Sequence, residues 1–149
     1  MKLKLILALA TASLAFAVPA FAVDNAATQD TQDKPDLAAA RAKIDAKDFP
    51  AAIILLSPMV TQYQDADVYN LLGFSYRMSG DLKQAATYYS KALDLDPNFK
   101  PAIEYQGELF LQMKDPDKAK ANLAKLVTLC PSGCEEKDDL EKAIAAYKP

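Results

Sequence analysis

The sequence predicts an all-α fold built from repeated helical hairpins, and three features of the chain support this prediction. Large apolar residues recur at helical spacing, as at Tyr69, Leu72 and Tyr76, which fall at i, i+3 and i+7. Residues that turn or stop a helix, such as Gly80 and Pro97, punctuate that spacing. The whole arrangement then returns 34 residues further along the chain. We therefore expect one domain with a linear core.

The best-formed unit covers residues 66–99, with its first helix expected near residues 67–78 and its second near residues 82–96. Asp81 suits the N-cap of the second helix, because its carboxylate can accept a hydrogen bond from the first turn. Pro97 ends that helix, because proline lacks the backbone donor and disfavours helical geometry in the residue before it. Both helices carry an apolar stripe, so an antiparallel pair can bury the two stripes together.

This unit resembles a tetratricopeptide repeat, a helix–turn–helix unit of about 34 residues. The positions that carry the likeness hold Tyr69, Gly73, Tyr76, Ala85, Tyr89, Ala92 and Pro97. Gly73 and Ala85 have almost no side chain, so we expect the helices to approach closely there, with Tyr89 adding bulk where they diverge. The resemblance implies an α-α superhelix, or solenoid, that binds other proteins and does not catalyse a reaction.

A second copy follows over residues 100–133. Its small, bulky and helix-stopping positions are Gly107, Phe110, Ala119, Leu123 and Pro131. Asp115 is expected to cap its second helix. Pro116 suits the first helical position, where a missing N–H leaves no hydrogen bond unmade.

A weaker copy precedes these two over residues 35–65, with a first helix expected at residues 35–46. On that helix the alanines expected to face one way are Ala39, Ala42 and Ala46. Asp48 lies in the following turn, and Ala52 and Leu56 are the small and bulky contacts of the second helix. A degenerate unit is typical of the end of an array, where one side meets water.

Residues 134–148 are expected to form a single amphipathic helix that caps the array. Ser132 and Glu135 have the spacing of a capping box, with Ser132 as N-cap. The expected apolar stripe consists of Leu140, Ala143, Ile144 and Tyr147. Such a helix suits a solenoid cap over the last repeat, and a free amphipathic helix awaiting a partner is the alternative. The array is thus expected to hold about three repeats and a capping helix.

The first 22 residues have the pattern of a secretory signal peptide of an exported bacterial protein. A basic start, Lys2 and Lys4, precedes an apolar stretch at residues 5–18, and Ala20-Phe21-Ala22 is a cleavage motif. An uncleaved anchor is the alternative. Residues 23–34 are polar and sparse in large apolar side chains, so we expect a flexible leader. The expected location is the periplasm or outside the cell.

Cys130 and Cys134 are the only cysteines, and in an exported protein their default state is a disulfide. The closed loop is small, so the chain-entropy relation gives a stabilisation of only about 2 kcal/mol. Thiol chemistry and a soft-metal site that includes Met113 are the alternatives. The spacing differs from Cys-x-x-Cys, and the chain has no histidine to complete a zinc or haem site.

Charge and composition argue against several other functions. The formal charge of the chain is −3, and removing Lys2 and Lys4 with the signal peptide would make it −5. Nucleic acid and anionic membrane surfaces are therefore disfavoured as partners. Without histidine there is no Ser–His–Asp arrangement, and the few glycines form no phosphate-binding loop. We expect no enzyme and no cofactor. The neighbouring carboxylates Glu104 and Glu108 are interpreted as a solvated helix face.

The resemblance implies a concave groove lined by the first helix of each repeat. The residues expected to bind a partner there are Arg41, Asn70, Phe74, Arg77, Met78, Glu104 and Glu108. The two arginines and the two glutamates suggest a groove of split polarity, suited to a partner of mixed charge. Phe74 and Met78 also continue an apolar stripe from Leu71, which either anchors a ligand or packs between repeats.

The predicted function is a non-enzymatic scaffold or adaptor of the cell envelope that holds a segment of another protein in this groove. The Lys, Asn and Arg clamp that binds chaperone tails in some similar proteins is missing at the corresponding positions. Self-association through the ends of the array is the alternative within the binding class. A thiol or metal function at the cysteine pair is the alternative from another class.

Overall fold

The computed structural model describes residues 34–148. The predicted signal peptide and nearly all of the predicted leader lie outside the described residues. The described part contains eight helices and no strand. They are α1 (Ala38–Asp45), α2 (Phe49–Leu56), α3 (Met59–Gln62), α4 (Ala66–Met78), α5 (Leu82–Leu95), α6 (Lys100–Gln112), α7 (Pro116–Leu129) and α8 (Glu135–Ala146). The predicted all-α fold is confirmed.

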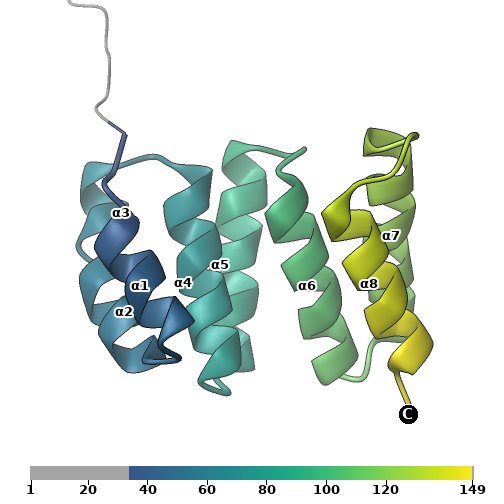
Figure 1. Cartoon of the computed structure of the whole chain (residues 1–149), viewed down its shortest axis with the longest axis horizontal. Helices are drawn as coiled ribbons and strands as arrows, with labels where there is room; N and C mark the ends of the chain where they lie inside the picture. The colour runs from purple at the N-terminus through teal and green to yellow at the C-terminus, as the bar shows by residue number, and fades with distance from the viewer. Residues whose placement is uncertain (1–33, 149) are drawn as a thin grey trace, which may run out of the picture. The chain divides into compact units, whose positions relative to one another are not determined.

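The helices form hairpins that stack side by side (Figure 1). Helix α1 pairs with α2, α4 with α5, and α6 with α7, while α8 packs against both α6 and α7. Three clusters of buried apolar residues follow one another along the stack, centred on Leu72, Tyr89 and Leu126. A core divided in this way is typical of a solenoid, in which each hairpin contacts only its neighbours.

One turn design recurs between the two helices of every hairpin. The residue before the cap has a positive φ, namely 57° at Lys47, 87° at Gly80 and 62° at Lys114. The next residue is an aspartate whose carboxylate accepts a hydrogen bond from a first-turn N–H, as in Asp48, Asp81 and Asp115. The predicted caps at Asp81 and Asp115 are confirmed, and Pro116 is the first residue of α7. This design fixes where each second helix begins.

The first hairpin differs from its prediction. Helix α1 begins at Ala38 and buries Ala40, while the alanines expected to face one way, Ala39, Ala42 and Ala46, are all exposed. The buried face is the one that carries the larger residues Leu37 and Ile44, because they gain more from burial than alanine does. The second half of the hairpin is also divided. Helix α2 ends at Leu56, and α3 starts again only after Pro58.

The start of α8 is the second correction. Its N-cap is Cys134 and not the predicted Ser132, and no side chain caps the helix. Gly133 adopts a φ of 93°, and its N–H donates to the carbonyl of Cys130 at 2.9 Å. The disulfide joins Cys130 to Cys134 across that turn, with their Cα atoms 5.8 Å apart. The chain is therefore still turning at Ser132, and the predicted capping box cannot form.

The third correction concerns the packing of Tyr89 beside Gly73. The space beside it is filled by the ring of Tyr89, since a Cβ placed on Gly73 would lie 2.6 Å from Cδ1 of that ring. Tyr89 therefore packs where α4 and α5 approach each other, not where they diverge. At Gly107 the same space is taken by Leu140 of α8, which would lie 2.6 Å from a Cβ. Leu140 of the capping helix thus packs against α6 as closely as Tyr89 packs against α4.

Candidate partner-binding groove

Three hollows lie along one face of the stack, and together we call them the groove. The aromatic hollow, about 310 Å³, is lined by Arg41, Ile44, Asp45, Leu71, Phe74 and Tyr105. The acidic hollow, about 200 Å³, is lined by Pro101, Glu104, Tyr105, Glu135, Glu136 and Asp139. The salt-bridge hollow, about 380 Å³, is lined by Arg77, Glu108, Leu111, Gln112, Ala143, Ala146 and Tyr147.

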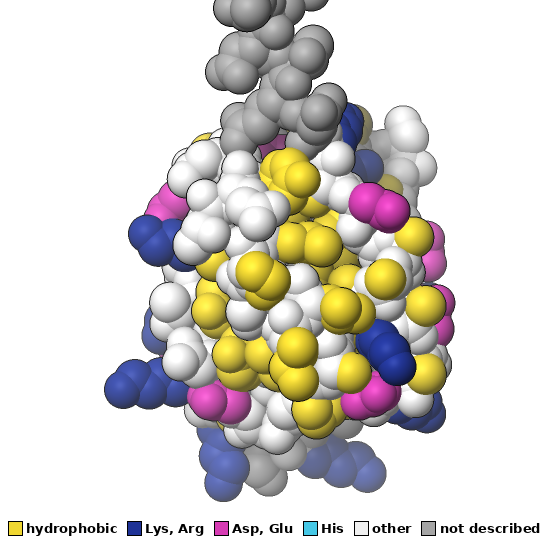
Figure 2. Space-filling model, turned by 90° about the vertical axis from the view of Figure 1, so that its left-hand side faces the viewer, with side chains coloured by type: hydrophobic (Ala, Val, Ile, Leu, Met, Phe, Trp, Pro, Cys, Tyr) yellow, Lys and Arg dark blue, Asp and Glu magenta, His cyan; other side chains and the backbone are white. Residues whose placement is uncertain are grey.

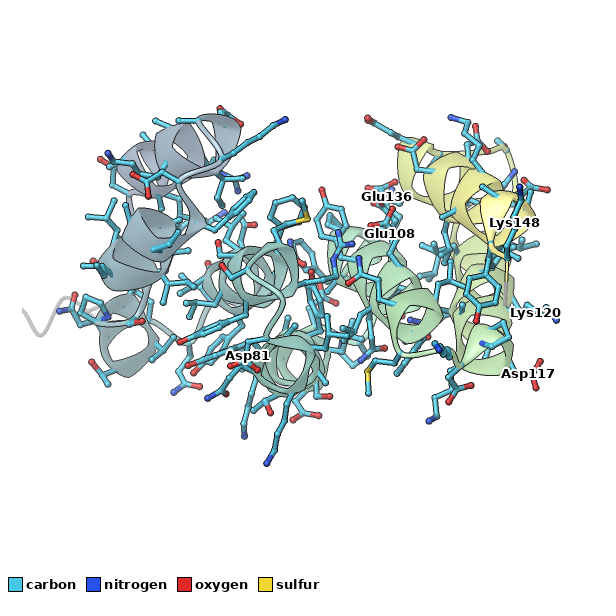
Figure 3. The ribbon with its side chains drawn as sticks, turned by 90° about the horizontal axis from the view of Figure 1, so that it is seen from below. Asp81, Glu108, Asp117, Lys120, Glu136 and Lys148 are labelled. Atoms are coloured by element: carbon cyan, nitrogen blue, oxygen red, sulfur yellow. A yellow bond between two sulfur atoms is a disulfide. The ribbon has the colours of Figure 1, made fainter. Side chains whose placement is uncertain are left out.

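Four helices build this groove. Seen from below, α1 and α8 stand on either side of the face while α4 and α6 lie between them (Figure 3). Tyr105 lines both the aromatic and the acidic hollow, so these two are continuous. In the same view Glu108 and Glu136 lie on the groove side of α6 and α8, whereas Asp117 and Lys120 lie on the far side (Figure 3). The groove is therefore formed by α1, by the first helices of the next two hairpins and by the capping helix.

Arg77 is held at the centre of the groove by several partners. Its Nη2 lies 2.7 Å from Oε2 of Glu108, and its Nε donates to the hydroxyl of Tyr89 at 3.4 Å. The guanidinium also lies over two rings, 5.4 Å from the centroid of Phe74 and 5.7 Å from that of Tyr105. Only 7% of Arg77 is exposed. A buried charge is tolerated when it is paired and hydrogen-bonded in this way.

Aromatic rings run from the first hairpin to the third. The ring of Phe74 lies 6.2 Å from that of Phe49 and 5.0 Å from that of Tyr105, centroid to centroid. Phe74 is half-buried, so part of its ring stays open to the aromatic hollow. Edge-to-face and tilted rings at these separations attract each other. The neighbours of Phe74 therefore hold its ring in place before any partner arrives.

Glu104 is a buried residue whose carboxyl group pairs with no other described residue. Only 7% of the residue is exposed, and within the described residues its carboxyl group makes no hydrogen bond or ion pair. Burial raises the pKa of Glu104 to about 8, and repulsion from Glu108, Asp139 and Glu136 adds to that effect, while Arg77 opposes it. The interpretation of Glu104 and Glu108 as a solvated face is therefore wrong for Glu104. A neutral carboxylic acid is the form that this position favours at neutral pH.

The structure brings some of the predicted groove residues together and separates others. Arg77 contacts both Phe74 and Glu108, and Glu104 lies in the acidic hollow. Arg41 lines the aromatic hollow and pairs with Asp67.

Asn70 and Met78 line none of the three hollows. Asn70 is buried, and its Oδ1 accepts no hydrogen bond from any described residue. Met78 lies at the end of α4 and is 45% exposed.

The predicted split polarity is wrong. Both arginines are neutralised by carboxylates, Arg41 by Asp67 and Arg77 by Glu108. Glu104 and the acids of α8 then remain, so the groove has an acidic part with no basic part opposite it.

Sequence reasoning missed Tyr105 and the whole contribution of α8. Tyr105 falls beside the positions that usually face such a groove, so the pattern does not single it out. The contribution of α8 could have been expected, because a helix that follows a complete hairpin takes the place of the next first helix. The acids in the first turns of α8 then face the groove, because α8 occupies the same place in the stack as the first helix of a hairpin.

The cysteines belong to the scaffold of the groove. Their disulfide links the end of α7 to the start of α8. Across residues 34–148, no group of three or more cysteine, aspartate, glutamate or histidine side chains is arranged to hold a metal ion. Nor does any helix in that range have the length and apolar character needed to cross a membrane.

The fold and the groove define a helical-repeat protein with an open concave face. Residues 66–99 and 102–133 each match the tetratricopeptide repeat, so the chain carries two such repeats and the predicted resemblance is confirmed over them. The uncharacterized protein ycf37 of Pyropia yezoensis is 28% identical over 117 residues, which cover 72% of this chain and 66% of the relative. The chain thus spans just under two thirds of that relative's length.

Solved structures support the same fold. PcrH in complex with the chaperone binding region of PopD superposes with a TM-score of 0.63 at 21% identity, covering 72% of this chain and 82% of PcrH. PcrH in complex with the chaperone binding region of PopB gives the same TM-score and identity and covers 88% of PcrH. At this identity the likeness concerns the fold alone.

Proposed function

We propose that this protein is a non-enzymatic scaffold or adaptor that holds a segment of a partner protein in the groove. The observation that carries the proposal is the partly open ring of Phe74, held between Phe49 and Tyr105 and backed by the buried Arg77. Anchors that are already ordered lose little conformational freedom when a partner binds. The PcrH structures, in which a similar fold holds regions of PopD and PopB, support the same proposal.

The site of action that we propose is the cell envelope, on the basis of the signal-peptide pattern in residues 1–22. Cell fractionation tests this location. The intact chain should be found in the periplasm or the medium, and a chain lacking residues 2–22 should stay in the cytoplasm. Equal distribution of the two chains would contradict the proposed export.

Photo-crosslinking from inside the groove tests the binding function. A photoreactive amino acid replaces Gln112, which is exposed and lines the salt-bridge hollow. The matched control carries it at Lys120, which is exposed on the far side of the stack (Figure 3). In living cells position 112 should give a discrete, saturable adduct that position 120 does not give, and Phe74→Ala should abolish it. Equal labelling from both positions would contradict binding in the groove.

Self-association is the second candidate, and an exposed apolar face favours it. Ile54 on α2 is 73% exposed, and the partly buried Ile53 and Val60 lie on α2 and α3. Figure 2 shows apolar side chains gathered on the face formed by α1 to α3. Exposed apolar patches of this kind mark interaction sites in soluble proteins.

Light scattering over a concentration series tests this second candidate. If the face associates, the average mass should rise with concentration and Ile54→Lys should remove the rise. Val127→Lys is the matched control, because Val127 is an exposed apolar residue on α7. A mass that stays monomeric across the series would exclude association through this face. For the thiol or metal alternative, two free thiols in the isolated protein would contradict the structural role of the disulfide.

A further inference from the structure

The acidic hollow contains only acidic, aromatic and proline side chains. Glu104 and Tyr105 come from α6, while Glu135, Glu136 and Asp139 come from the first turns of α8. No lysine or arginine lines this hollow. Four carboxyl groups thus share one small space that a cation would complement.

The acids of α8 have a structural explanation of their own. Glu135 and Glu136 lie in the first turn of the helix, where negative charge stabilises the N-terminal end. Asp139 pairs with Lys142, their charged atoms being 2.8 Å apart. These residues would be found here in a protein with no ligand at all, so they do not by themselves indicate one.

Glu104 has no such explanation. It lies in the second turn of α6, is more than nine-tenths buried and lines the hollow without a hydrogen bond or ion pair inside the described part of the chain. A carboxyl group that is largely removed from water and has no partner is costly. Its presence indicates a partner that arrives from outside the chain.

The chemistry of the hollow selects the kind of partner. The carboxylates of the described residues are not arranged to hold a metal ion, so an organic cation suits the hollow better. Tyr105 forms the wall shared with the aromatic hollow, so a chain that seats an apolar residue against Phe74 can carry its next polar side chain into the acidic hollow. Aromatic walls also suit the stems and charged heads of long basic side chains.

We propose that the acidic hollow binds a lysine or arginine side chain of the partner segment, next to an apolar residue of the same segment in the aromatic hollow. This inference rests on the proposed binding function and specifies the chemistry of the partner. Specificity follows because a partner with an acidic or neutral residue at that point leaves Glu104 unpaired or repelled.

Binding in this way releases a proton. Free Glu104 holds its proton at neutral pH, because burial and the carboxylates Glu108, Asp139 and Glu136 raise its pKa to about 8 against the opposing charge of Arg77. A bound cation favours the carboxylate, so the proton leaves Glu104 for the solvent as the basic side chain enters. The affinity for a basic side chain therefore rises with pH up to about 8.

The test uses two small probes and the full protein as isolated from cells. N-acetyl-argininamide carries the basic side chain, and N-acetyl-citrullinamide is its neutral isostere. Backbone amide shifts of Glu104, Tyr105 and Glu136 are followed by NMR during each titration. The arginine probe should give saturable shifts at these amides, with an affinity at least tenfold higher at pH 8 than at pH 6. The citrulline probe should give none.

Two variants with the same Glu→Gln substitution complete the test. Glu104→Gln should weaken binding of the arginine probe at least tenfold at pH 8 and abolish its pH dependence. Glu141→Gln, on the exposed outer side of α8, should leave both unchanged. Glutamine resembles the protonated acid, so the first variant should keep the well-dispersed spectrum of a folded protein.

Equal binding of the two probes, or equal effects of the two variants, would overturn the inference. The proposed function fails separately. If the adduct from position 112 persists while the arginine probe does not bind, only the basic-residue inference is lost. If no specific adduct forms, the groove function itself is lost.

Discussion

Glu104→Gln should change how the stability of the protein depends on pH. The pKa of Glu104 is about 8 in the folded chain, against 4.5 for a glutamate exposed to water in the unfolded chain. Between these values the folded state keeps the proton while the unfolded state has lost it. Glu104 therefore leaves the free energy of unfolding unchanged below about pH 4.5 and lowers it progressively as the pH rises to about 8. Glutamine never ionises, so the variant lacks this dependence.

The magnitude follows from the two pKa values. Each pH unit of difference corresponds to about 1.4 kcal/mol, and nearly the whole interval lies between pH 5 and pH 9. The variant should therefore gain up to about 4 kcal/mol in free energy of unfolding relative to the native chain over that range, and less to the extent that solvent screens the carboxylate. This is a large share of the roughly 5–15 kcal/mol that holds a typical domain folded.

Urea denaturation followed by far-UV circular dichroism at pH 5, 7 and 9 measures the effect. Glu141→Gln serves as the control, because it makes the same substitution at an exposed site. Its free energy of unfolding should stay parallel to that of the native chain. If the difference between native protein and Glu104→Gln were the same at pH 5 and pH 9, Glu104 would not be a buried acid with a raised pKa.

Three further changes test the scaffold through the same unfolding measurement. Gly73→Ala should lower the free energy of unfolding by about 1–3 kcal/mol, because the new methyl overlaps the buried Tyr89 ring. The loss should be smaller in a Tyr89→Leu background, and an equal loss in both backgrounds would reject that contact. Lys114→Gly should raise stability by about 1 kcal/mol by relieving a positive φ, and a decrease would show that the lysine side chain outweighs the backbone. Replacing Cys130 and Cys134 with serine should lower the free energy of unfolding by about 2 kcal/mol. No loss would mean that the capping helix packs in place without the disulfide.

Features set by local chemistry were predicted well from the sequence. The turns at Asp81 and Asp115 depend on a few neighbouring residues, whose backbone and carboxylate settle the start of the next helix. The spacing that gives the tetratricopeptide resemblance is likewise visible in the chain itself. These local signals were enough to predict the hairpins and their order.

Features set by distant neighbours were not predicted. Gly73 and Gly107 occupy equivalent positions, yet Tyr89 of the same hairpin fills the space beside one and Leu140 of the capping helix fills the space beside the other. The capping-box pattern at Ser132 was overridden by the disulfide and by the backbone of Gly133. In both places several packings satisfy the local pattern, and the tertiary neighbours select one.

The groove shows the same division. The resemblance pointed to Phe74, Arg77 and Glu108 one residue at a time, but the ion pair depends on how α4 stacks on α6. The burial of Glu104 depends on α8, which lies 30 residues further along the chain. A pattern of residues on one helix does not reveal which of its faces a later helix will cover.

The two ends of the helical stack are chemically unlike, and this difference limits any assembly. One end presents the exposed Ile54 with other apolar side chains, whereas the other is closed by the charged helix α8 and its disulfide. Head-to-tail growth needs two complementary ends, and the described helical stack does not present them. Contact through the apolar end alone is isologous, so it brings two copies together about a two-fold axis and then stops. If the protein associates through its apolar end, the capping helix would leave the second end without a matching surface, and a filament would not form.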